Sequence, residues 1–223
     1  MDFFKAENPD GCAKVLAEKI DGSLKQGEKV LWLLSGGSNI PISVVAMNIL
    51  RTRNTDGVLS NLAVTLTDER YGPVGHKDSN WQQLVDAGFI FTKTKLLPVL
   101  KNLSLEKTVM DYDNGITDLF QWADKSIGQF GIGNDGHIAG VLPHTSGVFD
   151  PGVAVSYEAP PFTRITLTLK TIQKISAVYA FVFGQSKKAT LSHLQGENLS
   201  LNEEPSTVLK LLPEAYLYSD QLI

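Results

Sequence analysis

The chain has 223 residues, a net charge of −4 and a hydrophobic fraction of 43%, a balance typical of a globular protein with one sizeable core. The negative charge argues against nucleic acid as a partner, because such proteins need clustered Lys and Arg. Residues 1–5 lack the basic start of a signal peptide, and no stretch reaches the ~18 apolar residues of a membrane span. The single cysteine, Cys12, cannot form an internal disulfide, so we expect a cytoplasmic protein.

The first half of the chain alternates helical and extended patterns. A helix is expected over 10–25 and a buried strand over 29–34, followed by the turn Ser35-Gly36-Gly37-Ser38-Asn39 and a helix from Pro41. A turn between a strand and a helix directs backbone N–H groups at whatever lies above the strand, which favours anions. The pattern matches neither the dinucleotide fingerprint nor the P-loop. A plain tight turn is the alternative.

The next strand, expected over 61–67, ends in the charged run Asp68-Glu69-Arg70. Three charges at a strand end are costly unless they are solvated, paired or used. In open α/β sheets this end is where ligands bind, although a solvated loop is the alternative. Ser79 can cap a following helix. His76, in the loop between, is expected to be exposed rather than a ligand.

A strand over 95–100 and a helix over 103–122 lead to a weak strand over 126–130, which is interrupted by Gly128. The glycine loop Gly131–Gly140 follows. It places Asp135 and His137 on either side of Gly136, so the imidazole has an orienting partner two residues away. An ordinary glycine turn with a surface histidine is the alternative. A helix is expected to begin within 138–142, and no metal-ligand spacing is present.

The last third predicts strands over 153–157, 164–169, 177–183 and 215–218, with helices opening at 185–189 and over 205–212. Ser186 is the expected N-cap of the first of these helices. Lys187 is a cation at the unfavourable end of the helix dipole, which makes sense if it faces an anion. A frayed surface lysine is the alternative. Alternating strands and helices indicate a mainly parallel sheet with helices on both faces.

Such a sheet brings three polar strand ends to one edge: Ser35 to Asn39, Asp68 to Arg70, and Asp135 to His137. Arg164 and Lys187 would add two cations. This combination predicts a site for a polar, phosphorylated small molecule with one histidine placed for proton transfer.

The motifs, taken in order, resemble the glucosamine-6-phosphate isomerase/6-phosphogluconolactonase family. The turn Ser35 to Ser38 with Pro41 is similar to the family's sugar-phosphate loop, and Gly131 to Ala139 is similar to its G-x-G-x-DGH-(T/I)-A motif. The remaining matches are Asp68-Glu69-Arg70 with Asp78-Ser79-Asn80, Arg164-Ile165-Thr166-Leu167-Thr168, and Gly184 with Lys187. One such motif is weak evidence, whereas five in the right order are specific.

The resemblance implies one α/β domain over 1–223, with a Rossmann-like, mainly parallel sheet of the NagB/RpiA/CoA-transferase-like type. It implies hydrolysis of 6-phosphoglucono-1,5-lactone in the pentose phosphate pathway by a monomer or small homo-oligomer, with no metal or organic cofactor. His137 would be the general base, and Asp135 or Asp68 would orient it or the water. The implied substrate and phosphate ligands are Ser35, Gly36, Gly37, Ser38, Arg70, Arg164 and Lys187.

Two alternatives stay open. In the deaminase branch, which resembles DGHIAFNEP, a proton-relaying glutamate precedes the proline, and Leu142 stands there in this chain. That branch also commonly reads Asp-Glu-Tyr where this chain has Asp68-Glu69-Arg70. Both differences favour the lactonase. A non-catalytic sugar-phosphate-binding homologue is the second alternative. The chain departs from the lactonase pattern at Asn39-Ile40, where a single Thr is usual, and at Val141-Leu142.

Overall fold

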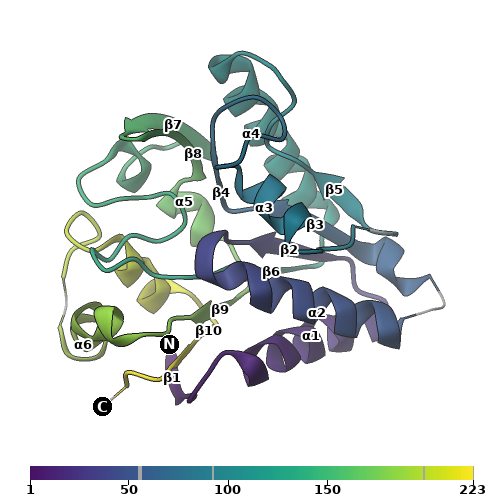
Figure 1. Ribbon diagram of the computed structural model, residues 1–223, viewed down its shortest axis with the longest axis horizontal. Coiled ribbons are helices and arrows are strands. Elements are labelled where there is room, and N and C mark those ends of the chain that lie inside the picture. Colours follow the sequence, from purple (N-terminus) through teal and green to yellow (C-terminus); the bar gives the residue numbers. More distant parts are fainter. Residues whose placement is uncertain (55–56, 92, 198, 223) are drawn as a thin grey trace.

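The computed structural model describes residues 1–54, 57–91, 93–197 and 199–222. A seven-stranded sheet runs through the centre of the molecule, and its strand order is β1-β10-β9-β6-β2-β3-β5 (Figure 1). Every neighbouring pair in this sheet is parallel. Its strands are β1 (Asp2–Lys5), β2 (Val30–Leu34), β3 (Leu62–Leu66), β5 (Lys95–Leu97), β6 (Lys125–Phe130), β9 (Ala177–Phe181) and β10 (Ala215–Ser219).

Helices cover both faces of this sheet. In Figure 1, α1 and α2 lie together below the sheet and α4 lies above it. The helices are α1 (Asp10–Lys25), α2 (Ile40–Arg53), α3 (Asn80–Asp86), α4 (Leu105–Trp122), α5 (Leu169–Ile172) and α6 (Lys188–Gly196). Short 3₁₀ segments are η1 (Gly37–Asn39), η2 (Val58–Asn61), η3 (Ser146–Val148), η4 (Gln185–Lys187) and η5 (Pro205–Leu211). Within the described ranges, no helix is long and apolar enough to cross a membrane.

The sequence patterns account for these elements. All five residues of β2 and all five of β3 are buried, as expected for strands covered on both faces. Helix α1 buries the apolar stripe that includes Leu16 and Ile20. Helix α4 begins at Ser104, whose side chain accepts a hydrogen bond from the Lys107 N–H. The predicted α/β class, with a mainly parallel sheet and helices on both faces, is confirmed.

A second, three-stranded antiparallel sheet was not predicted. Its order is β4-β8-β7, with β4 (Asp68–Arg70), β7 (Ala154–Ala159) and β8 (Phe162–Leu167). The alternating pattern identified β7 and β8 as strands, but a pattern does not name a strand's partner. The charged run Asp68-Glu69-Arg70 is therefore a strand, paired in register with Thr166, Ile165 and Arg164, and not a solvated loop.

Three local predictions were wrong, and one strand was missed. Residues 138–142 form a tight turn, in which Ile138 and Val141 exchange two backbone hydrogen bonds and Ala139 has a φ of 52°. Ser186 is not a helix N-cap. It lies within η4, which follows Gly184, and α6 begins after Lys187 without a side-chain cap. His76 is half-buried, and its Nε2 lies 2.9 Å from the Arg70 carbonyl oxygen. The strand β1, which is mostly exposed, escaped prediction.

The strand order reverses at β2. The chain passes from β2 to β3 and β5 on one side, and β6 then returns to the other side of β2. Loops that leave β2 and β6 therefore diverge, and ligands of open α/β sheets bind at such a switch point. The carboxyl ends of β9, β6, β2 and β3 lie next to one another there.

The glycine that weakens β6 has a steric cause. A Cβ built on Gly128 would lie 2.6 Å from Cε2 of Phe130 and 3.2 Å from Val178 Cγ2. Because Phe130 and Val178 are themselves buried, neither can move into solvent. The centre of the sheet therefore tolerates only glycine at this position.

We predict that Gly128→Ala lowers the free energy of unfolding by about 1–3 kcal/mol through overpacking. Gly22→Ala is the matched control, because Gly22 lies in α1 and a Cβ added there would have no atom within 4 Å. That change should stabilise the protein by up to about 1 kcal/mol. Urea denaturation of both variants measures the difference, and equal stability of Gly128→Ala and the wild type would contradict the packing argument.

Candidate active site

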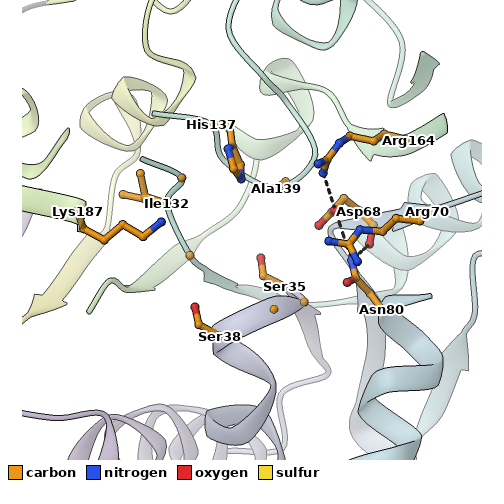
Figure 2. Close-up of a pocket in the computed structure, with 14 residues that line it drawn as sticks. Ser35, Ser38, Asp68, Arg70, Asn80, Ile132, His137, Ala139, Arg164 and Lys187 are labelled. Atoms are coloured by element: carbon orange, nitrogen blue, oxygen red, sulfur yellow. Dashed lines mark hydrogen bonds and ion pairs between the residues drawn. The ribbon is translucent and has the colours of Figure 1, made fainter. Parts of the chain in front are cut away.

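A cavity of about 240 Å³ opens at the switch point between β2 and β6 (Figure 2). Segments far apart in sequence line it. They are the turn after β2, strand β4, the start of α3, the glycine loop after β6, strand β8 and the segment after β9. The lining residues are Ser35, Gly36, Gly37, Ser38, Asp68, Arg70, Asn80, Gly131, Ile132, Gly133, His137, Ala139, Arg164 and Lys187.

The turn after β2 forms the floor of the cavity in Figure 2 and runs directly into η1 and α2. The first N–H groups of a helical segment have no partner within it and attract anions. Ser35 is buried, and its hydroxyl lies 3.0 Å from the hydroxyl of Thr67. That bond ties the turn to the end of β3, so two neighbouring strand ends hold the floor in place.

Strand β4 carries two buried carboxylates with different surroundings. Glu69 accepts hydrogen bonds from the backbone N–H groups of Arg70, Asn80 and Trp81 and from the Ser79 hydroxyl. Burial raises the pKa of Glu69, and these donors oppose the rise. The carboxylate thus fastens the first turn of α3 to β4. In consequence, Asn80 reaches back and donates to the Asp68 carbonyl oxygen at 3.0 Å.

Asp68 faces the cavity beside two arginines. Its Oδ2 lies 4.0 Å from Nη1 of Arg164, and Figure 2 shows both guanidinium groups on this side of the cavity. Arg70 and Arg164 are cross-strand partners in the small sheet, and like charges in that position repel. The Arg70 guanidinium donates to the Asp78 carbonyl oxygen at 3.0 Å and lies 5.3 Å from the centre of the Phe162 ring.

His137 and Asp135 form a hydrogen-bonded pair, and the His137 side of this pair lines the cavity. Nδ1 of His137 lies 2.6 Å from Oδ1 of Asp135, which also accepts from the His137 backbone N–H. The ring packs on Gly133, where a Cβ would come within 2.0 Å of Nδ1. A carboxylate at Nδ1 favours the tautomer protonated there. The Nε2 atom is then left as the acceptor.

The loop that carries His137 is held from several directions. Thr190 donates to the Asn134 carbonyl oxygen at 2.8 Å, and the Ser206 N–H donates to Gly136 at 2.9 Å. The Tyr157 hydroxyl donates to the Gly140 carbonyl oxygen and accepts from the Leu142 N–H. Such bracing fixes the direction of the imidazole before any ligand arrives.

Lys187 enters the cavity from the side opposite to the arginines, as Figure 2 shows. Lys187 is the last residue of η4, which follows Gly184, and α6 begins immediately after Lys187. Desolvation lowers the pKa of Lys187, and the charge of Asp135 opposes that shift. Positive charge therefore reaches the cavity from two directions.

Unpartnered polar atoms gather at this cavity. Among the described residues, four buried side-chain polar atoms have no hydrogen-bond partner, and three of them belong to Arg70, Asn80 and Arg164. All three of these residues line the cavity, so the wall contains polar side chains with hydrogen-bonding atoms that the protein itself leaves unpaired. Within the same ranges, no group of three or more His, Cys, Asp or Glu side chains is placed to hold a metal ion.

The structure brings together the residues that the sequence singled out. Nine of the ten line the cavity, and the tenth, Asp135, lies behind His137 and bonds to it. Their roles stay predictions. The sequence predictions left out Asn80, although it stands in the Asp78-Ser79-Asn80 motif. Asp68 is placed against Arg164 and Asn80 and not against His137, so the imidazole's bonded partner is Asp135.

Comparison with known proteins now adds to this geometry. Residues 5–214 match the family described as glucosamine-6-phosphate isomerases/6-phosphogluconolactonase. The chain belongs to this family. A 6-phosphogluconolactonase from Neisseria meningitidis is 29% identical over 219 residues, which cover 86% of each chain.

Solved structures of other family members share the fold. A 6-phosphogluconolactonase from Thermotoga maritima has a TM-score of 0.78 at 19% identity, and the match covers 98% of both chains. A monomeric glucosamine-6-phosphate deaminase has a TM-score of 0.80, also at 19% identity, and the match covers 99% of this chain and 98% of that one. Likeness at this identity establishes the NagB-superfamily fold and does not separate the two reactions.

The pair at the cavity gives a direct titration test. The hydrogen bond from His137 is the largest cause that lowers the pKa of Asp135, from an ordinary 3.8 to about 2. We predict that carbon-13 NMR of the Asp135 carboxyl shows a midpoint near 2 in the wild type.

In His137→Ala that midpoint should rise, because the hydrogen bond and the charge of the imidazole are lost while burial still disfavours the charged form. His193→Ala is a suitable control, since its ring bonds to Glu204 instead. An unchanged midpoint near 2 in His137→Ala would show that the imidazole does not hold the carboxylate.

Proposed function

We propose that this protein hydrolyses 6-phosphoglucono-1,5-lactone to 6-phosphogluconate. Its family membership supports this, as does the likeness to proteins named 6-phosphogluconolactonase. The observation that carries the proposal is the His137–Asp135 pair, which faces a cavity lined by Lys187 on one side and by Arg70 and Arg164 on the other. A base with an orienting carboxylate, beside cations that suit a phosphate, is what this reaction requires.

The imidazole acts as the general base in this scheme. Neutral His137 accepts a proton at Nε2 from a water molecule while the water oxygen attacks the lactone carbonyl carbon. Asp135 holds the ring through Nδ1 and stabilises the imidazolium that forms. The bond between the carbonyl carbon and the ring oxygen then breaks, and His137 returns the proton to that oxygen. The products are an alcohol and a carboxylic acid, which ionises to the carboxylate.

The negative oxygen of the tetrahedral intermediate needs donors in fixed positions. The turn Ser35 to Ser38 and the glycine loop both supply backbone N–H groups at the cavity wall. We assign the water-orienting role to Asp68, which is buried and faces the same space. No step requires a metal or an organic cofactor.

The phosphate group is assigned to the cations and the glycine turn. Lys187 and Arg164 enter from opposite sides, so a phosphate between them would be gripped from two directions. Arg70 is held by Asp78 and Phe162 next to Arg164, and it adds positive charge at that side. The partner is thus a small phosphorylated lactone, handled by residues 1–223 as one domain in a monomer or small homo-oligomer.

The cavity favours the lactonase over the deaminase. A deaminase of this family relays protons through a glutamate, and no glutamate is among the described residues that line the cavity. Glu69 is close by, but its carboxylate is occupied by four donors. Leu142 lies outside the cavity lining, and its aliphatic side chain cannot accept or donate a proton. Ammonia release from glucosamine 6-phosphate tests that alternative directly.

The decisive assay follows the loss of freshly made 6-phosphogluconolactone, coupled to oxidation of the product, with buffer alone as the control. The wild type should accelerate the loss well above the spontaneous rate. His137→Ala should lower kcat by roughly 10²–10⁴-fold, which is the usual contribution of a general base. Circular dichroism and a thermal melt establish that the variant is folded, and near-normal turnover in a folded variant would remove His137 from the base role.

The cations should act on binding more than on turnover. Arg164→Ala and Lys187→Ala should each raise KM by roughly tenfold or more, because a charge-assisted hydrogen bond of about 1.5–3 kcal/mol is lost. Lys188→Ala is the matched control, because Lys188 is the next residue in the chain and does not line the cavity. Unchanged KM in both cavity variants would argue against phosphate contact.

A further inference from the structure

Two unusual features of the sequence meet inside the protein. The first is Asn39, which with Ile40 departs from the sugar-phosphate loop that the turn resembles. The second is Gln129, a polar residue near the carboxyl end of the weak strand β6. Both side chains are buried, with exposed fractions of 1% and 0%. Neither lines the cavity, yet each lies within two residues of Ser38 or Gly131, which do.

The Gln129 side chain is bonded to the start of α2. Its Nε2 donates to the backbone oxygen of Asn39 at 3.0 Å and also lies 3.3 Å from Asn39 Oδ1. Its Oε1 accepts from the Ser43 hydroxyl at 2.9 Å. The Ser43 hydroxyl also lies 3.1 Å from the Asn39 backbone oxygen. Gln129 therefore ties strand β6 to the end of the glycine turn.

The Asn39 side chain extends the connection to the end of one more strand, β9, and also contacts the end of β6. Its Nδ2 donates to the Phe181 carbonyl oxygen, at the end of β9, over 3.2 Å. It also occupies the space beside Gly131, where a Cβ would come within 2.8 Å of Nδ2. One buried amide thus touches the ends of β6 and β9, while its own backbone ends the turn that forms the cavity floor.

We propose that Asn39 and Gln129 are a matched pair of positioning residues that sets the separation between the glycine turn and the loop that carries His137. This inference rests on the proposed function, because it assigns the pair an effect on sugar-phosphate binding. The two walls belong to different strands, and this network is a direct side-chain link between them. Buried polar networks in a low dielectric are stiff when every member is satisfied.

Loss of the pair should misplace the walls without removing any group that touches the substrate. Displacements of about 1 Å at a binding site can cost up to ~10²-fold in rate. We expect Asn39→Ala and Gln129→Leu each to raise KM for the lactone roughly tenfold, and to weaken binding of 6-phosphogluconate, measured by calorimetry, by a similar factor. The double variant should be little worse than the poorer single one, because both changes break one network.

Ser126→Ala is the matched control. Ser126 lies at the opposite end of β6, is buried, and shares a hydroxyl–hydroxyl contact of 3.1 Å with Ser176. Its loss should lower the melting temperature by a comparable amount and leave KM and the 6-phosphogluconate Kd within about twofold of the wild type. A purely structural role for Asn39 would make its variant behave as the control does, and that result would overturn the proposal.

Ser43→Ala is a milder variant, for use if Asn39→Ala does not fold. It removes one hydrogen bond from Gln129 and should raise KM about two- to threefold; an unchanged KM contradicts the proposal. A wild type that hydrolyses no lactone contradicts the proposed function alone, because the Kd comparison still decides this inference. A wild type that neither hydrolyses the lactone nor binds 6-phosphogluconate overturns both.

Discussion

The parallel pairing of β2 with β6 on one side and β3 on the other is the constraint on which the site depends. Parallel strands end at the same edge, so the polar turns that follow β2, β3 and β6 must converge. The reversal of strand order at β2 separates the turn after β2 from the loop after β6 and leaves a cavity between them. This arrangement places the glycine turn and the loop that carries His137, and the second sheet adds Asp68, Arg70 and Arg164.

Charge is buried at this edge in two distinct ways. Glu69 is saturated with donors and serves to fasten α3 to β4. Arg70, Arg164 and Asn80 retain buried polar atoms without partners at the cavity. Glu69 is thus satisfied by the protein itself, whereas the three residues with unpaired atoms line the cavity.

Local patterns were enough to predict most of the large sheet. The buried runs at β2 and β3 and the amphipathic stripe of α1 each have one stable interpretation. Strand β1 is four residues long and mostly exposed, so its sequence carries no burial pattern. The turn at 138–142 was mistaken for a helix because its apolar residues recur at helical spacing. What decides its shape is the pair of backbone bonds between Ile138 and Val141.

The sequence was enough to find the candidate site residues, but not the buried residues that hold the walls of the site in place. The ten candidate residues stand in motifs that also occur in the family, so their sequence positions were sufficient to find them. The sequence showed Asn39 only as a departure from the family pattern and the strand of Gln129 only as weak, and a polar residue in a central strand is unfavourable without a partner. Only the tertiary structure shows that each supplies the other's partner. Pairing across 90 residues of chain leaves no local signal.

A crystal structure with 6-phosphogluconate bound tests the central claim most directly. The account predicts the phosphate at the turn Ser35 to Ser38, between Lys187 and Arg164, and the carboxylate carbon on the His137 side, with an oxygen within hydrogen-bond reach of Nε2, about 2.6–3.2 Å. A sugar phosphate bound away from this cavity would contradict the account. So would one that places its phosphate against the imidazole.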